Sequence, residues 1–394
     1  MRILVINSGS SSIKFQLIVM PSAEAICEGM VERVGLEDAK IHFHSAQKEF
    51  EKVIPVRDHK EGLKTIASYL MDPDFGVVKS ADEIDVVGHR VVHGGSTFSG
   101  TTVINEAVKD KIRALFALAP LHNPPNLEGI LVSEEVFPDA KQIAVFDTAF
   151  HQTIPVEAFK YAIPNRFLDE DGIRVYGFHG TSHKYVSERA MEYLGRTSSK
   201  IITIHLGNGC SMTAIKDGQS IDHTLGFSPM NGLIMGTRSG DIDASIIFYL
   251  VNSLGYSLDE VNRILQKESG MLGLTGYSDL RDIQREAQDG NNTCQLALKM
   301  YAYRIQKFIG AYAAAMNGLD AIVFTAGVGE NSDVLRSLVC ENMDFLGISI
   351  DQQKNEVRSG ELREINTISS KVKVLIIPTN EELEIARQAF DLME

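Results

Sequence analysis

Two stretches of the chain share one pattern: an apolar run, a short polar turn with glycine, and a second apolar run. The first spans residues 3–19 and turns at 7–12, and the second spans residues 200–215. Each pattern predicts a β-hairpin with a polar tip. Backbone N–H groups and hydroxyls at such a tip can bind an anion, and Lys14 adds a cation beside the first. Because the pattern occurs in each half, we expect two related domains whose hairpins hold a chain of phosphates across a cleft.

The remaining pattern indicates strands that alternate with helices, which is typical of an α/β fold. Helix starts are marked by Asp58, with Glu61 as a capping-box partner, and by Asn105. Residues 155–171 look irregular, so we place a domain boundary near their start and expect domains at 1–150 and 151–382. Further predicted strands are 25–34, 41–54, 86–87, 142–146, 321–325 and 372–377, and the longer helices after the boundary are 242–254, 258–266, 293–316 and 379–393.

Composition and charge narrow the class of protein. The 394 residues are 44% hydrophobic and 23% charged, which fits two globular domains with sizeable cores. A net charge of −14 without a Lys/Arg-rich block argues against nucleic acid or an anionic membrane as a partner. The four cysteines are far apart and no apolar run approaches a membrane span, so we expect a soluble cytoplasmic protein without a disulfide framework.

Three glycine-bearing turns follow apolar strands, at residues 7–12, 207–211 and 327–331. The third also opens a helix, where backbone N–H groups point outward. The chain has no Walker-type P-loop, and the sequence from Gly327 to Ser332 lacks the last glycine of a G-x-G-x-x-G motif. Three such turns nevertheless favour a nucleotide-binding cleft over purely structural turns.

Two arginines, Arg90 and Arg238, lie in segments flanked by glycine, which predicts that both occupy loops. Arginine can bind a carboxylate or a phosphate through two parallel hydrogen bonds. The alternative is a solvated surface arginine, but a glycine-flanked loop favours a functional role.

Asp147 and His179 are further candidates. Asp147 follows an apolar strand, so its carboxylate either faces a cleft or serves a turn or helix cap. His179 stands just before a predicted helix whose dipole disfavours the charged imidazole, so we expect a neutral hydrogen-bond donor. The spacing of His179 and His183 occurs in zinc sites, but no suitable third ligand is nearby and we do not expect zinc.

The last predicted helix begins with four polar residues. Thr379 and Glu382 fit a capping box, which gives Glu382 a structural role. Glu381 then either favours the helix dipole or binds a metal. The residues alone leave both interpretations open.

Seven segments in the same order make the sequence similar to the acetate kinase family, within the wider superfamily of actin, heat-shock proteins and sugar kinases. The resemblance covers essentially the whole chain. It implies two ribonuclease-H-like domains with an active-site cleft between them, pairing as a homodimer, and a C-terminal helix at about 383–394 that packs on the first domain. The segments are 7–15, 88–95, 146–151, 176–183, 205–211, 238–243 and 327–331.

The resemblance implies the reversible reaction ATP + acetate ⇌ ADP + acetyl phosphate by direct in-line transfer, with Mg²⁺ or with Mn²⁺ in its place. Asn7 and Glu381 resemble the metal-site residues, and Arg90 resembles the residue that binds the carboxylate. The residues that resemble the catalytic group are Asp147 as an acid, and His179 and Arg238 as stabilisers of the transferring phosphoryl group. The methyl pocket would be Val92, Leu121, Phe178 and Pro229. The ATP contacts would be Lys14, His205, Leu206, Gly207, Asn208, Gly209, Asp279, Leu280, Arg281, Gly327, Val328, Gly329, Glu330 and Asn331.

The chemistry of the substrate favours a different role for Asp147. A carboxylate substrate is already ionised at pH 7, so we expect Asp147 to position hydrated Mg²⁺ or its Arg and His partners rather than to remove a proton. A propionate or other short-chain acyl kinase is the nearest alternative, because one methylene in an apolar pocket changes binding by only about 1–3 kcal/mol. Val92 favours acetate. A non-enzymatic ATP-binding switch would not need Arg90 or His179, and a sugar kinase would need a more polar pocket.

Overall fold

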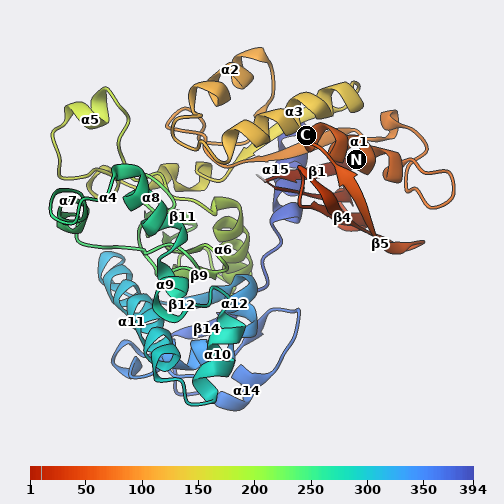
Figure 1. The fold of residues 1–394 in the computed structure, drawn as a ribbon. Coiled ribbons are helices and arrows are strands. Elements are labelled where there is room, and N and C mark those ends of the chain that lie inside the picture. Colours follow the sequence, from red (N-terminus) through yellow and green to blue (C-terminus); the bar gives the residue numbers. More distant parts are fainter. Residues whose placement is uncertain (10) are drawn as a thin grey trace. The chain divides into compact units, whose positions relative to one another are not determined.

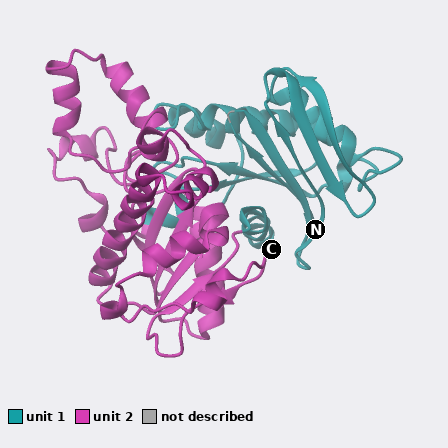
Figure 2. Cartoon of the chain, turned by 60° about the horizontal axis from the view of Figure 1, so that its bottom comes forward, with its two compact units in different colours: residues 1–152, 380–394 teal, residues 153–379 magenta. Residues whose placement is uncertain are grey.

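The computed structural model describes residues 1–9 and 11–394 and forms two compact units (Figure 1). Unit 1 contains residues 1–152 and 380–394, and unit 2 contains residues 153–379 (Figure 2). Ser10, part of the predicted phosphate-binding tip, lies outside the described residues.

Unit 1 is built on an eight-stranded mixed sheet with the order β5-β4-β3-β2-β1-β6-β8-β7. The predicted first hairpin is confirmed: β1 (Arg2–Ser8) pairs antiparallel with β2 (Ser12–Val19). β1, β6 and β8 run parallel to one another. The other strands are β3 (Glu24–Glu32), β4 (Leu36–Ser45), β5 (Glu49–Val56), β6 (Val86–Val91), β7 (Thr102–Val103) and β8 (Lys141–Phe146). The helices are α1 (His59–Leu70), α2 (Glu106–Ala114), α3 (Asn123–Val136) and α15 (Glu381–Met393), with 3₁₀ turns at Ala81–Glu83 and Ala149–Thr153.

Helices cover both faces of this sheet. Ile3 and Val5 of β1 share a buried cluster with Ile385 of α15. Their neighbours Leu4 and Ile6 point to the opposite face and share a cluster with residues of α1 and α3. A central parallel strand is therefore apolar at successive positions, because both of its faces are buried. This apolar contact packs α15 against the sheet of unit 1, which fixes where the first residues of the helix lie.

Unit 2 is built on a six-stranded mixed sheet with the order β11-β10-β9-β12-β14-β13. The second hairpin is also confirmed, since β9 and β10 pair antiparallel, and β9 runs parallel to β12. The strands are β9 (Lys200–Leu206), β10 (Cys210–Lys216), β11 (Gln219–His223), β12 (Ala321–Thr325), β13 (Arg363–Glu364) and β14 (Lys373–Ile376). The helices are α4 (Val156–Phe159), α5 (Arg166–Asp169), α6 (Gly180–Leu194), α7 (Ser245–Asn252), α8 (Leu258–Lys267), α9 (Gly270–Thr275), α10 (Leu280–Gln288), α11 (Asn292–Ala315), α12 (Ala326–Asn331), α13 (Asp333–Cys340) and α14 (Gln352–Glu356), with a 3₁₀ turn at Asp344–Leu346.

The two sheets share an arrangement in which the first strand of a hairpin pairs in parallel with a later strand. β1 pairs with β6 in this way, and β9 pairs with β12. This confirms the predicted α/β class, and the structure shows that both sheets are mixed. No helix of the described residues is both long enough and apolar enough to cross a membrane.

Local signals located some helix starts correctly and missed others. Asp58 caps α1 by accepting a hydrogen bond from Glu61 N, and Asn105 caps α2 by accepting one from Val108 N, as predicted. Glu61 does not complete the capping box, because its carboxylate accepts from Arg57 N instead. Residues 155–171 are not wholly irregular, since they contain α4 and α5, and α7 begins three residues later than predicted.

Candidate active site

Polar side chains of unit 1 gather where three parallel strands end. Asn7 lies near the end of β1, Arg90 lies near the end of β6, and Asp147 directly follows β8. The carboxyl ends of parallel strands meet at one edge of a sheet, where α/β proteins usually bind ligands. Three residues that the sequence pattern singled out separately are therefore neighbours in unit 1.

Arg90 is a strand residue, so the predicted glycine-flanked loop is wrong at this position. Arg90 lies opposite Val145 in the ladder between β6 and β8. Gly88 serves helix packing rather than a turn, because a Cβ there would lie 3.0 Å from Cγ2 of Ile385 in α15. Arg238 does lie in a loop, between β11 and α7, as predicted.

A largely buried ion pair joins Arg90 and Asp147. Arg90 Nε donates to Asp147 Oδ1 at 3.1 Å and to Oδ2 at 3.0 Å, and Arg90 Nη2 donates to Oδ2 at 2.5 Å. Arg90 Nη1 also donates to Asn7 Oδ1 at 3.2 Å. Burial alone would lower the pKa of Arg90, but the nearby carboxylates of Asp147, Glu381 and Glu382 outweigh it and raise that pKa. These contacts hold the guanidinium plane in one orientation.

The start of α15 brings acidic residues into unit 1. The predicted capping box at Thr379 is wrong, because the N-cap is Asn380, whose side chain accepts a hydrogen bond from Leu383 N at 2.9 Å. Asparagine caps a helix at least as well as threonine, so the helix starts one residue later. Glu382 pairs with Lys14 instead, with 2.7 Å between Oε1 and Nζ.

Glu381 is the first residue of α15 and has charged neighbours. Burial is the main cause that raises its pKa, and Asp147 and Glu382 raise it as well, whereas Arg90 and Lys14 lower it. The net result is a pKa of about 6. Counting Glu381 itself, three carboxylates lie near the two cations Arg90 and Lys14, and this excess of negative charge favours a divalent cation. No three His, Cys, Asp or Glu side chains form a metal-binding group in residues 1–9 and 11–394. A metal at Glu381 would therefore keep water or substrate oxygens among its ligands.

The four residues expected to hold a methyl group divide between the units. Val92 of unit 1 is buried and donates its backbone N–H to Asn126 Oδ1 at 3.0 Å, whereas Leu121 is 56% exposed. Phe178 of unit 2 is buried, and Pro229 lies in the loop that contains Arg238. That these four residues form one pocket stays a prediction.

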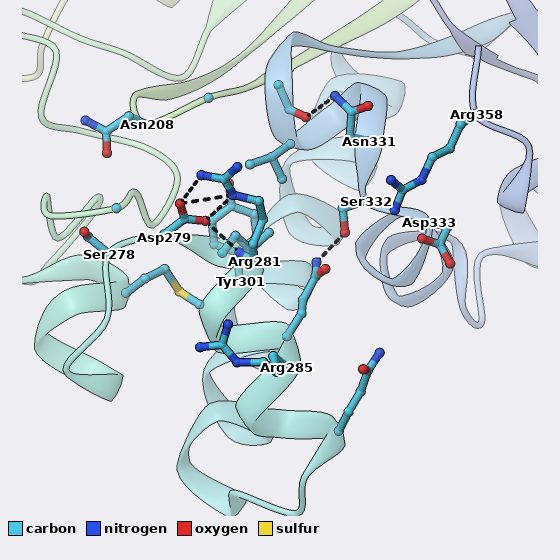
Figure 3. A pocket seen from close by; sticks show the side chains of 18 residues that line it. Asn208, Ser278, Asp279, Arg281, Arg285, Tyr301, Asn331, Ser332, Asp333 and Arg358 are labelled. Carbon is cyan, nitrogen blue, oxygen red and sulfur yellow. Dashed lines mark hydrogen bonds and ion pairs between the residues drawn. The ribbon is translucent and has the colours of Figure 1, made fainter.

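Unit 2 contains a cavity of about 780 Å³ (Figure 3). This volume is within the usual range for small-molecule sites. The turn after β9, the start of α10 and the helix α12 all contribute to its wall. His205, Leu206, Gly209, Gly329 and Glu330 do not line this cavity, and Lys14 belongs to unit 1. Of the predicted ATP contacts, those that line it are Gly207, Asn208, Asp279, Leu280, Arg281, Gly327, Val328 and Asn331.

The third predicted glycine turn is in fact the short helix α12. Ala326 begins it with φ of 63°, a left-handed conformation that is rare for a residue other than glycine. Arg336 of α13 is buried and donates to Gly329 O at 2.8 Å, to Glu330 O at 2.9 Å and to Asn355 Oδ1 at 2.7 Å. A helix stabilised by an arginine of the next helix is not visible in the local pattern.

Three arginines line the cavity, and of these only Arg281 was predicted. Arg281 Nε donates to Asp279 Oδ1 at 3.0 Å and Nη2 donates to Oδ2 at 2.6 Å (Figure 3). This side-chain bond is the main reason why the pKa of Asp279 falls to about 2. Arg285 lies one helical turn after Arg281, so helical spacing could have found it. Arg358 follows α14 on a separate segment, and no local signal links it to the cavity.

Gly236 and Tyr301 also line the cavity and were not predicted. A Cβ on Gly236 would lie 2.4 Å from Asn208 Oδ1, so any other residue here would displace the Asn208 amide. Gly236 N donates to Asn208 O at 3.2 Å. The Tyr301 hydroxyl lies 2.9 Å from the Cys210 thiol, which fixes the aromatic ring in the wall.

His179 and Arg238 come together beside Gly209 in unit 2. A Cβ on Gly209 would lie 3.6 Å from His179 Nε2 and 3.6 Å from Arg238 Nη1. Arg238 Nη1 donates to Pro229 O at 2.8 Å, and burial lowers the pKa of Arg238. His179 stands at the N-cap of α6 with φ of 56°, which confirms its predicted place ahead of a helix. Two nitrogen donors beside a glycine turn suit an anionic ligand.

Comparison with known proteins gives full-length matches. The model of the acetokinase family matches residues 2–387. The chain is 66% identical over 394 residues to an acetate kinase of Flavobacterium johnsoniae, with 100% of both chains covered. The crystal structure of Porphyromonas gingivalis acetate kinase matches with a TM-score of 0.94 and 43% identity, covering 100% of both chains. A propionate kinase from Francisella tularensis matches with a TM-score of 0.92 and 42% identity, covering 98% of both.

The fold is that of an α/β protein with two mixed sheets, each of which contains a hairpin. The arginine-lined cavity of unit 2 is typical of a nucleotide-binding site. The chain belongs to the acetokinase family. This membership confirms the resemblance that the sequence motifs indicated, while the roles of the individual site residues stay predictions.

Proposed function

We propose that the protein is an acetate kinase. It transfers the γ-phosphoryl group of ATP to a carboxylate oxygen of acetate, reversibly and in line, and the products are acetyl phosphate and ADP. The observation that carries the proposal is the 66% identity over the full length to an acetate kinase. Such a transfer mainly requires that the two substrates are positioned and that charge on the phosphoryl oxygens is stabilised.

The cavity of unit 2 is the proposed ATP site. Its volume of about 780 Å³ suits a nucleotide, and Arg281, Arg285 and Arg358 offset part of the phosphate charge. The turn at Gly207 offers backbone N–H groups to the same phosphates. Lys14 of unit 1 is assigned to these phosphates as well. That the two units face each other across an active-site cleft stays a prediction.

Arg90 is the proposed carboxylate-binding residue. A guanidinium has five N–H groups, and Asp147 takes the edge formed by Nε and Nη2. Asn7 takes one N–H of Nη1, so within residues 1–9 and 11–394 each terminal nitrogen keeps one N–H for a ligand. These two groups suit the two oxygens of acetate, and the Arg90 side chain is 20% exposed.

Mg²⁺ is the proposed metal, with Mn²⁺ able to replace it, and Asn7 and Glu381 would hold it. Both residues offer oxygen ligands, and Mg²⁺ is usually bound by one or two carboxylates together with water and phosphate oxygens. The cluster around Glu381 has an excess of carboxylates, which a cation would offset. When bound, the ion neutralises charge on the phosphates.

Asp147 is proposed to position Arg90 rather than to act as a base. Acetate is already ionised at neutral pH, so the attacking oxygen carries no proton. The three Arg90–Asp147 contacts fix the guanidinium against which acetate would bind. His179 and Arg238 are proposed to donate hydrogen bonds to the transferring phosphoryl oxygens, where charge stabilisation matters most.

A propionate kinase is the second candidate. The similarity to a propionate kinase from Francisella tularensis, at 42% identity, is nearly as high as that to the acetate kinase of Porphyromonas gingivalis, at 43%. Val92 favours the smaller acid, and a single methylene changes binding by only about 1–3 kcal/mol, so activity on both acids is expected.

The protein is proposed to work as a cytoplasmic homodimer. α7 has no buried residue, and its Ile246, Phe248 and Tyr249 are 42%, 65% and 60% exposed. An exposed apolar helix of this kind is typical of a subunit interface. Light scattering is expected to give twice the 43.4 kDa chain mass. Phe248→Glu should lower that mass to one chain, and an unchanged dimer would place the interface elsewhere.

Hydroxylamine trapping tests the kinase proposal directly. The protein is incubated with ATP, Mg²⁺ and hydroxylamine, and hydroxamate is measured with acetate, propionate and butyrate. We expect most product from acetate. A clear preference for propionate would favour the second candidate. ATP binding without hydroxamate from any acid would replace both with a non-enzymatic switch.

A further inference from the structure

A row of hydrogen-bonding side chains runs through the interior of unit 2 to His179. Ser211 Oγ lies 2.8 Å from His179 Nδ1 and 2.7 Å from His183 Nε2. The other ring nitrogen of His183, Nδ1, lies 2.7 Å from Thr203 Oγ1. Ser211, His183 and Thr203 are fully buried, so water does not compete for these bonds.

The Thr203 hydroxyl proton determines which atom donates in each hydrogen bond of this row. Within the part of the chain that the structure describes, Thr203 Oγ1 has no hydrogen-bond partner other than His183 Nδ1. A buried hydroxyl proton without an acceptor is costly, so Thr203 donates to His183 Nδ1. Neutral His183 then carries its proton on Nε2 and donates it to Ser211 Oγ. The single proton of Ser211 is left to donate to His179 Nδ1.

We propose that Thr203, His183 and Ser211 are positioning residues that hold His179 in the tautomer with its proton on Nε2. A neutral imidazole whose Nδ1 accepts a hydrogen bond carries its proton on Nε2. Nε2 is also the ring nitrogen that lies, with its neighbour Cε1 and with Arg238 Nη1, beside Gly209. The inference rests on the proposed function, in which His179 donates to the transferring phosphoryl group. The opposite tautomer would present a lone pair to anionic oxygens and repel them.

A second row of the same kind ends at His205. Thr379 Oγ1 donates to Ser182 Oγ at 2.9 Å, and Ser182 Oγ lies 2.8 Å from His205 Nδ1. Because Ser182 accepts from Thr379, its own proton donates to His205 Nδ1. The rings of His205 and His179 stack, with centroids 4.4 Å apart and planes 18° apart. Two stacked histidines are thus held with Nδ1 as the acceptor and Nε2 as the protonated nitrogen.

Nitrogen NMR of the full-length protein measures the tautomer without turnover. The chain is labelled with ¹⁵N-histidine, and ring nitrogens are correlated with ring carbon-bound protons through two-bond couplings. The His179 signals are assigned by their loss in His179→Gln. We expect a protonated Nε2 and an unprotonated Nδ1 for both His179 and His183. A proton on His179 Nδ1 in the unmodified protein would overturn the proposal.

Ser211→Ala tests the role of this row of hydrogen bonds, since it removes one hydroxyl and adds no bulk. We expect His179 to show a mixture of tautomers and kcat to fall about tenfold, as expected for one lost hydrogen bond, with little change in either KM. Ser187→Ala is the matched control, because Ser187 is also buried and its hydroxyl donates to Lys184 O at 2.9 Å, outside the row. It should leave the His179 signals and kcat unchanged.

Ser211→Thr keeps the hydroxyl and should restore the Nε2 tautomer. An unchanged His179 tautomer in a folded Ser211→Ala protein would overturn the proposal, whatever the activity. Failure of the kinase proposal is distinguishable, because it would appear as an absence of hydroxamate, whereas the tautomer is read without substrate.

Discussion

Lys14 Nζ lies 2.7 Å from Glu382 Oε1, so an ion pair connects the first hairpin of unit 1 with its last helix. The Glu382 side chain is only 10% exposed, whereas that of Lys14 is 51% exposed. Lys14 can therefore stabilise an acidic side chain and still present part of its length to a ligand.

Lys14→Ala should raise the KM for ATP much more than the KM for acetate, because the lysine is assigned to the phosphates. Glu382→Gln is the matched control, since it removes the same ion pair but keeps the cation. Steady-state kinetics with each substrate varied in turn measure both effects. Equal changes in the two KM values for Lys14→Ala would mean that Lys14 serves only the scaffold.

Asp147→Asn should raise the KM for acetate and lower kcat, because an amide cannot hold the Arg90 guanidinium by the same charged, two-pronged contact. Loss of one charge-assisted bond of this type corresponds to about 1.5–3 kcal/mol, or roughly tenfold to a hundredfold in kcat/KM. The pH profile should keep its shape. Intact metal affinity and geometry, together with a lost activity that follows a Brønsted-type pH dependence, would instead identify Asp147 as a base.

Gly236→Ala should weaken ATP binding, because the new methyl group would displace Asn208 from the cavity wall. Gly310→Ala is a suitable control: Gly310 lies in α11, where a Cβ meets no atom within 4 Å. That control should raise stability by about 1 kcal/mol through helix propensity and leave ATP binding unchanged. Calorimetric titration with ATP measures the difference, and equal affinities in the two variants would exclude the steric argument.

The stability of unit 1 should fall as pH falls from about 6.5 to 4. Burial lowers the pKa of both His89 and His93 from 6.5 to about 4. The unfolded chain therefore binds more protons in this window, and each histidine contributes roughly 3 kcal/mol that is present above pH 6.5 and lost toward pH 4. Asp222 of unit 2 acts oppositely, because burial raises its pKa to about 6 and its contribution is lost as pH rises.

Denaturant unfolding at several pH values measures this dependence. His89→Gln should reduce the slope of stability against pH, because glutamine carries no titratable proton. A slope identical to that of the unmodified protein would show that His89 is not buried in its neutral form.

Local sequence signals were enough to predict those features whose stabilising partners are close in sequence. The hairpin β1–β2 is specified by two apolar runs and a polar turn, and Asp58 and Asn105 bond N–H groups three residues away. The family motifs then named the site, including Arg90, Asp147 and Glu381, which unit 1 brings together.

The remaining features depend on contacts between distant segments. Gly88 looked like a turn signal, but it makes room for Ile385 almost three hundred residues later. Arg336 stabilises α12 from the next helix, and Arg358 reaches the cavity from an irregular segment. Asn380 displaced Thr379 as the cap because both residue types suit that position, and only the packing of α15 decides between them.

The split of unit 1 along the chain has a consequence for biosynthesis. Its sheet is synthesised first, but α15 leaves the ribosome only after all of residues 153–379. Until then, Ile3, Val5 and Val145 lack the helix that shields them, and the edge with Arg90 and Asp147 lacks Glu381. A nascent chain is therefore expected to need chaperone protection of this apolar face, and a polypeptide interrupted before α15 would lack Glu381, one of the two proposed metal ligands.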